Sequence, residues 1–150
     1  MNTLGRNQRE LRFEREVTPA SLSAEGSTAD QMVAEAISAK RAWVLQLDMM
    51  MQHEERDEQR ETLRLIRLDE LKHVRLLSAL PQAKDQTTDD SARPEGVIGY
   101  SRAAKLKLRS AEFVRRLYYC YTDAPTRDTV FEIICDDTNN AIRFTLLAQE

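Results

Sequence analysis

Glycine, proline and aromatic residues are scarce in this sequence, and their scarcity argues against sandwiches and barrels. The 150 residues include four glycines, four prolines and 6% aromatic residues. Folds built of many short strands need frequent turn residues, whereas this chain is rich in Leu, Ala, Glu, Arg and Gln, which favour helices. A chain of this length holds one domain with a proper core and is too short for two. We therefore expect a single all-α domain.

Long apolar runs are missing too, and so is any marked excess of basic charge. No run approaches the roughly 20 apolar residues that span a bilayer, and the first residues, MNTLGRNQRELRFEREVT, lack a hydrophobic signal core. We expect a cytoplasmic protein without a membrane partner. A net charge of −3 and a pI near 5.5 argue against a nucleic-acid partner. The two cysteines, Cys120 and Cys135, are too few for a disulfide framework, and we expect reduced thiols.

Apolar residues at helical spacing predict four long helices. They cover about 29–52, 55–80, 100–122 and a last segment from about 127 nearly to the C-terminus. Ser27, Thr28 or Asp30 caps the first of them. Residues 81–99 are polar and rich in turn formers, so they form a long crossover between two helical hairpins. This pattern predicts a four-helix bundle over residues 28–150, preceded by a charged extension at 1–27.

Each predicted helix carries polar residues within its apolar stripe, near its middle. These residues are Lys40, Glu70, His73, Glu112, Asp137 and Asn140. Glu112 is assigned to a stripe that also holds Leu108 and Tyr119. Burying such groups without partners is costly, several kcal/mol for a charged one. One lysine against three carboxylates leaves about −2 with a neutral histidine, which one divalent metal ion balances. A protonated His73 plus one proton shared among the carboxylates does so as well.

These polar residues resemble the ligand pattern of the ferritin-like superfamily, and most closely the small bacterial rubrerythrin-like proteins. That family holds two irons with one Glu from the first helix, Glu-x-x-His from the second, Glu from the third and Glu-x-x-His from the fourth. The resemblance covers about residues 29–148 and is strongest in IRLDELKH and SAEFVRRLYYCYTDAPTRDTVFEIICDDTNNAIRF. It implies that Glu70, His73 and Glu112 match family ligands.

Three of the six ligand positions depart from the family pattern. Lys40 occupies the first-helix position, and Asp137 and Asn140 replace the glutamate and histidine of the fourth helix. Asp137 can still ligate a metal with its shorter arm, whereas an amide is a weak ligand and an ammonium is none. These changes argue against a standard di-iron centre.

We interpret the chain as a ferritin-like bundle whose di-iron site has eroded, with Lys40 in buried ion pairs that replace the metal. It is then non-enzymatic or binds at most one metal ion. The alternative is a metal-dependent oxidoreductase of the rubrerythrin or peroxidase type, with one iron, manganese or zinc ion held by Glu70, His73 and Asp137 beside Glu112. A building block of a spore or stress-associated coat is a third interpretation. We expect a homodimer, since amphipathic bundles of this size often dimerise.

Overall fold

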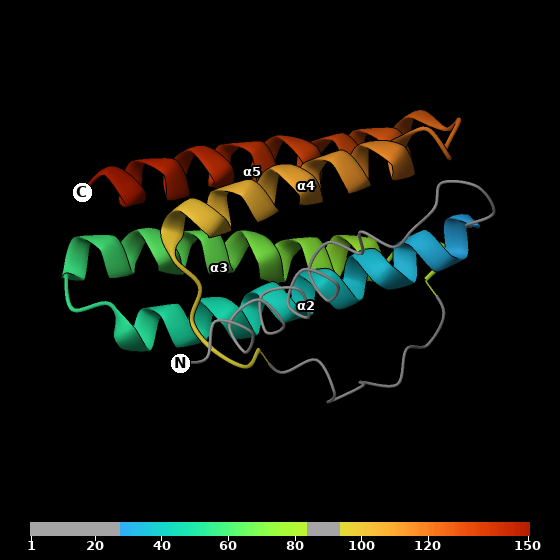
Figure 1. Ribbon diagram of the computed structural model, residues 1–150. Helices are drawn as coiled ribbons and strands as arrows, with labels where there is room; N and C mark the ends of the chain where they lie inside the picture. Colours follow the sequence, from blue (N-terminus) through green and yellow to red (C-terminus); the bar gives the residue numbers. More distant parts are fainter. Residues whose placement is uncertain (1–27, 84–93) are drawn as a thin grey trace, which may run out of the picture.

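The protein is a four-helix bundle in the computed structural model, which describes residues 28–83 and 94–150 (Figure 1). The helices are α2 (Ala29–His53), α3 (Asp57–Ser78), α4 (Tyr100–Tyr118) and α5 (Ala124–Gln149). The predicted all-α four-helix bundle is confirmed, and each helix end lies within about one turn of its predicted position. The predicted extension at 1–27 lies outside the described residues. No helix in the described ranges has the length and apolar character that a bilayer crossing requires.

Side-chain caps define where two of the helices begin. Thr28 accepts a hydrogen bond from the backbone N–H of Gln31, and the Gln31 side chain accepts one from the backbone N–H of Thr28. This reciprocal pair satisfies two amide groups that a helix start leaves open. Asp123 caps α5 in a similar way through the N–H of Thr126, and Pro125 follows in the first turn, where its missing N–H does no harm.

The helices form two antiparallel hairpins that pack face to face. In Figure 1, α2 lies along α3, and α4 lies along α5. Leu80, just after α3, packs in the same cluster as Val33 at the start of α2. Tyr100, at the start of α4, instead hydrogen-bonds Glu54 at the end of α2. The chain therefore leaves α3 at one end of the bundle and enters α4 at the other, so α3 and α4 run in the same direction.

The apolar core is divided into two clusters by a polar layer at mid-length. One cluster surrounds Trp43 and Phe144, whose rings stack with centroids 5.8 Å apart. The other surrounds Ile37 and Leu117 toward the opposite end of the bundle. On every helix buried polar residues lie between members of the two clusters, and in the described residues only Gln46 and Gln59 are buried elsewhere. The helices are therefore held together by hydrophobic contact at both ends and by polar contact in the middle.

Gln46, buried on α2, attaches the connection before α4 to the bundle. With its amide oriented to satisfy both neighbours, it donates to the carbonyl of Gly96 at 3.0 Å and accepts from the N–H of Ile98 at 2.9 Å. Two backbone groups of an otherwise irregular segment thus find a partner inside the protein. A buried polar group without such a partner costs about 1–3 kcal/mol.

Replacing Gln46 by Met should lower the free energy of unfolding by about 1–3 kcal/mol, because the new side chain fills similar space but leaves both backbone groups unpaired. Denaturant unfolding monitored by circular dichroism measures the change. Gln52→Met, at an exposed position of the same helix, is the matched control and should change stability by less than about 0.5 kcal/mol. Equal stability of the two variants would contradict this role of Gln46.

Candidate functional site

The polar layer brings together side chains from all four helices. Lys40 comes from α2, Glu70 and His73 from α3, Lys107 and Ser110 from α4, and Asp137 from α5, and all six are buried. The sequence predicted four of them, namely Lys40, Glu70, His73 and Asp137. The structure places these four in one cluster, as expected.

Lys40 makes the closest contacts with Asp137. Its Nζ donates to the two carboxylate oxygens at 2.5 and 2.6 Å, and to Ser110 Oγ at 3.2 Å. Glu70 Oε2 lies 3.6 Å from the same nitrogen. Ser110 in turn donates to Asp137 Oδ2 at 2.8 Å. Charge-assisted hydrogen bonds of this kind are about twice as strong as neutral ones, so Asp137 is tightly fixed between α2 and α4.

Lys107 is the second cation of the cluster and completes its charge balance. Its Nζ donates to Glu70 Oε1 and to Asp137 Oδ1, the latter at 3.2 Å. The same ammonium lies over the ring of Trp43, 4.4 Å from the ring centroid, where the π-electrons attract a cation. Two ammonium groups thus face two carboxylates, which gives a net charge of zero with His73 neutral.

Burial and charge act against each other on these groups, and the outcome differs among them. Burial works against ionisation of Asp137, but the charges of Lys107 and Lys40 outweigh it and hold the pKa of the carboxyl well below its usual 3.8. Burial also opposes the charge on Lys40, yet Asp137 and Glu70 raise its pKa above 10.5. For Lys107 burial prevails, with Lys40 adding to it, and the pKa is lowered. Lys107 therefore holds its ammonium proton less tightly than Lys40 does.

His73 connects the cluster to the surface between α3 and α5. Its Nε2 lies 2.9 Å from Asp136 Oδ2, and Lys72 Nζ lies 2.6 Å from the same oxygen. The hydrogen bond with His73 is the main reason why the pKa of Asp136 is lowered. A carboxylate at Nε2 selects the tautomer with its proton there and leaves the Nδ1 lone pair facing inward. Nδ1 lies 3.8 Å from both Glu70 Oε1 and Asp137 Oδ1 and has no hydrogen-bond partner.

Asn140 is buried, as predicted, but belongs to a neighbouring contact. Its amide donates to Asp69 at 3.2 Å, and its oxygen accepts from Arg143 at 2.8 Å. The contact mirrors the one made by His73. Both α3 and α5 carry two adjacent acids, and the first of the two binds a side chain of the other helix: Asp136 binds His73, and Asp69 binds Asn140. His73 and Asn140 each lie three positions after the second acid of their own helix. The two halves of the bundle thus repeat one arrangement with a histidine in one copy and an asparagine in the other.

The prediction that Glu112 lies on the inner face of its helix is wrong, because its side chain is exposed. Leu108, on the same predicted stripe, is 52% exposed, and Tyr119 lies beyond the end of α4. The buried face of α4 lies on another side of the helix and contains Lys107 and Ser110. Apolar residues spaced by three, seven and four, namely Ala103, Leu106, Phe113 and Leu117, are the signal that identifies this face.

Glu70, His73 and Asp137 form a buried group that could hold one metal ion. Their ligand atoms lie within 4.8 Å of one another, and Asp136 orients the histidine from behind, as outer carboxylates do in metal sites. Two ions do not fit this set of residues. Lys40 and Lys107 contact the carboxylate oxygens that the ions would need, and Asn140 faces Asp69 and Arg143.

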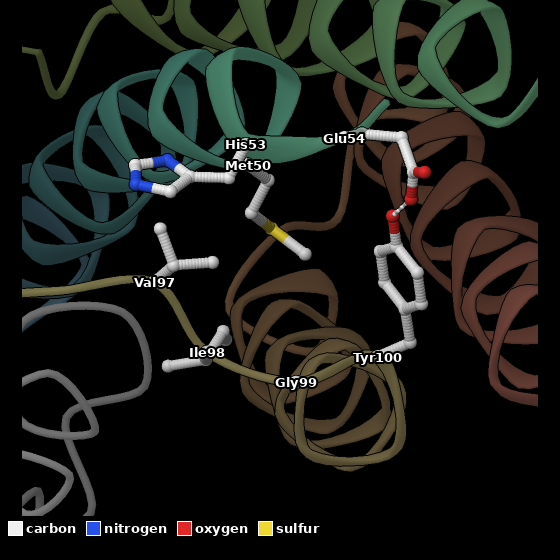
Figure 2. A pocket seen from close by; sticks show the side chains of 7 residues that line it. All are labelled: Met50, His53, Glu54, Val97, Ile98, Gly99 and Tyr100. Atoms are coloured by element: carbon white, nitrogen blue, oxygen red, sulfur yellow. Dashed lines mark hydrogen bonds between the residues drawn. The ribbon is translucent and has the colours of Figure 1, made fainter. Parts of the chain in front are cut away.

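A pocket of about 220 Å³ lies at the end of the bundle (Figure 2). Its polar side chains are already paired. Glu54 accepts hydrogen bonds from Arg56 and Tyr100, which lower the pKa of its carboxyl to about 2, and His53 Nδ1 lies 2.8 Å from the carbonyl of Met49. These contacts close the turn between α2 and α3 against the start of α4.

Cys120 and Cys135 are exposed and form no disulfide.

No family model, curated protein or solved structure matches this chain.

Lys107→Met should lower the free energy of unfolding by about 3–5 kcal/mol, because it leaves Glu70 and Asp137 buried with one cation between them. Adding Glu70→Gln should restore part of that loss, since the pair of changes removes one charge of each sign. Denaturant unfolding of the single and double variants measures the coupling. Lys105→Met, at an exposed position of α4, is the control. Independent, additive effects of the two substitutions would contradict the ion pair.

Asp137 should make the protein sensitive to acid. Its pKa is lower in the folded than in the unfolded chain, so its stabilising effect is complete above about pH 4 and is lost as the pH falls toward the folded pKa. The free energy of unfolding of Asp137→Asn should be lower at neutral pH and fall less steeply in acid. Asp128→Asn, exposed on the same helix, should follow the wild-type slope. Parallel curves for all three proteins would show that Asp137 does not titrate as described.

Proposed function

We propose that this chain is a ferritin-like bundle in which two lysines have replaced the metal ions, and that it acts as a non-enzymatic protein through its outer surface. One observation carries the proposal. The ammonium of Lys107 lies against Glu70 Oε1 and Asp137 Oδ1, the two oxygens that His73 Nδ1 also faces. A cation of the chain itself thus occupies the place where these three side chains would bind an ion.

The pattern of replacement supports this interpretation. In the resembled family, the first and third helices each supply one carboxylate, whereas here α2 supplies Lys40 and α4 supplies Lys107. Lys40 puts a positive charge in place of a negative one, the buried Lys107 adds a second, and together they balance Glu70 and Asp137. A single chance substitution would leave an unpaired buried charge, which is strongly destabilising. The matched pair instead keeps the cluster neutral without a metal.

A second candidate is a protein that binds one metal ion in the same cluster, and the orientation of His73 favours it. Its inward Nδ1 lone pair lacks a hydrogen-bond partner, which is unusual for a buried nitrogen. With Glu70 and Asp137 it offers the mixed nitrogen and oxygen ligands that suit iron, manganese or zinc. A redox-active ion here would supply oxidoreductase chemistry. Binding would require Lys107 to lose its proton or move away, and the lowered pKa of Lys107 makes the first step less costly.

Metal content distinguishes the two candidates. The full chain, purified without a histidine tag, is incubated with Fe²⁺, Mn²⁺ or Zn²⁺, desalted and measured by elemental analysis. We expect far less than one ion per chain in the wild type. Lys107→Ala should take up an ion, because it frees the two oxygens, and adding His73→Ala should abolish that uptake. Lys105→Ala is the control for a lysine lost from the surface of α4.

About one ion per wild-type chain, lost in His73→Ala, would overturn the proposal and support the single-metal protein. Because Lys107→Ala is expected to be less stable, circular dichroism must first show that it is folded at the temperature of the assay. Lys107→Gln, which keeps much of the side-chain volume without the charge, provides a second variant for the same measurement.

A further inference from the structure

Large exposed hydrophobic side chains collect on α3 and α5. Ten such side chains are found in the described part of the chain, and six of them belong to these two helices: Leu65, Leu68, Leu71, Phe131, Ile142 and Leu146. These two helices are neighbours in the bundle. Concentrated apolar surface of this kind marks an interaction site more often than scattered single residues do.

The outer face of α5 carries an uncharged stripe that is apolar toward both of its ends. Phe131, Ile142 and Leu146 are 57%, 55% and 55% exposed, and Cys135 is exposed beside them. At 100° per residue these four positions fall within a sector of about 60°. The positions between them on this face are the uncharged Thr138 and Asn139. From 131 to 146 the outer stripe therefore contains no charged residue, although it faces away from the core.

The stripe is complementary to itself when two copies run in opposite directions. About a midpoint between 138 and 139, Phe131 and Leu146 are equally distant, and so are Cys135 and Ile142. A two-fold axis at this point would place Phe131 of each copy against Leu146 of the other, and Cys135 against Ile142. Such isologous contacts, in which the same patch serves both subunits, are the commonest form of protein dimer.

Charges beside the stripe favour the same antiparallel arrangement. Glu132 and Arg143 both lie on the α3 side of the stripe, and their side chains are 52% and 40% exposed despite their contacts with Lys72 and Asp69. In an antiparallel pair, Glu132 of one copy lies beside Arg143 of the other on the same flank. In a parallel pair about a two-fold axis, the α3 flanks of the two copies would lie on opposite sides of the interface, so Glu132 of one copy would not meet Arg143 of the other.

We propose that two copies of this chain form a homodimer through the outer faces of their α5 helices, packed antiparallel about an axis near Thr138 and Asn139. Under the proposed function the protein acts through its outer surface, and the dimer provides a partner for that surface, namely a second copy. It does not depend on the metal content of the interior, so elemental analysis and molar mass test the two proposals separately.

Molar mass in solution tests the dimer. Sedimentation equilibrium of the full chain at micromolar concentrations should give twice the mass of one chain. Ile142→Glu should raise the dimer dissociation constant at least 10-fold, because it buries a charge in the apolar stripe. Leu108→Glu, at a similarly exposed leucine of α4, is the matched control and should leave the mass unchanged. A monomeric wild type overturns the proposal, because any partner of the stripe is then residues 1–27 or another protein and not a second copy. Equal effects of the two substitutions also overturn it.

Cross-linking tests the antiparallel alignment. In a chain with Cys120→Ser and Cys135→Ser, a cysteine at Asn139 lies within about one residue of the axis, so its counterpart is opposite. A cysteine at Asp128, near the start of the stripe, lies about 30 Å along the helix from its counterpart, at 1.5 Å per residue. A short bismaleimide should therefore link Asn139→Cys chains and not Asp128→Cys chains. Efficient linking at Asp128, or none at Asn139, overturns the alignment.

Discussion

The rest of the structure depends on the pairing of two buried ammonium groups with two buried carboxylates. The four side chains come from four different helices, so each helix must present its polar residue at the same height and turned toward the same point. Hydrophobic layers tolerate sliding and rotation better than this, because one apolar side chain can replace another in a contact. A misplaced helix would leave a buried charge without a partner, at a cost of several kcal/mol. We infer that the polar layer fixes the alignment of the bundle more strictly than it adds to its stability.

The acids that flank the layer extend it outward between α3 and α5. Asp136 contacts His73 on its inner side and Lys72 on its outer side, while Asp69 contacts Asn140 and Arg143. Each of these carboxylates thus lies between a buried group and a basic side chain at the surface. Such chains of hydrogen bonds reinforce one another in a medium of low dielectric constant. They also link α3 to α5, because each acid contacts two side chains of the opposite helix.

The sequence was sufficient to predict the fold and part of the site, and the limit lies in how accurately a helical face can be identified. Glu70 and His73 reinforce each other three positions apart, so the inner face of α3 was predicted correctly. On α4 the expectation of a carboxylate led to Glu112, whereas the apolar residues point to the face of Lys107. One position along a helix turns a side chain by about 100°, which is enough to move it from the core to the solvent. Asn140 shows a second limit, because its burial follows from its own helix but its partner, Asp69, depends on how two helices are rotated against each other.

The buried face and the exposed apolar face of α5 belong to one helix and are best considered together. Where a polar site at the centre of a bundle serves an ion or a substrate, surface residues near it need only keep the protein soluble. Here Asp137, the buried acid of α5, pairs with lysines of the same chain, while the outer face of the helix keeps Phe131, Ile142 and Leu146 exposed. Exposed apolar residues at these positions offer a lone chain no packing energy and promote aggregation. The exposure of three large apolar side chains on the outer side of a helix whose buried acid is already paired is best accounted for by a partner that covers them.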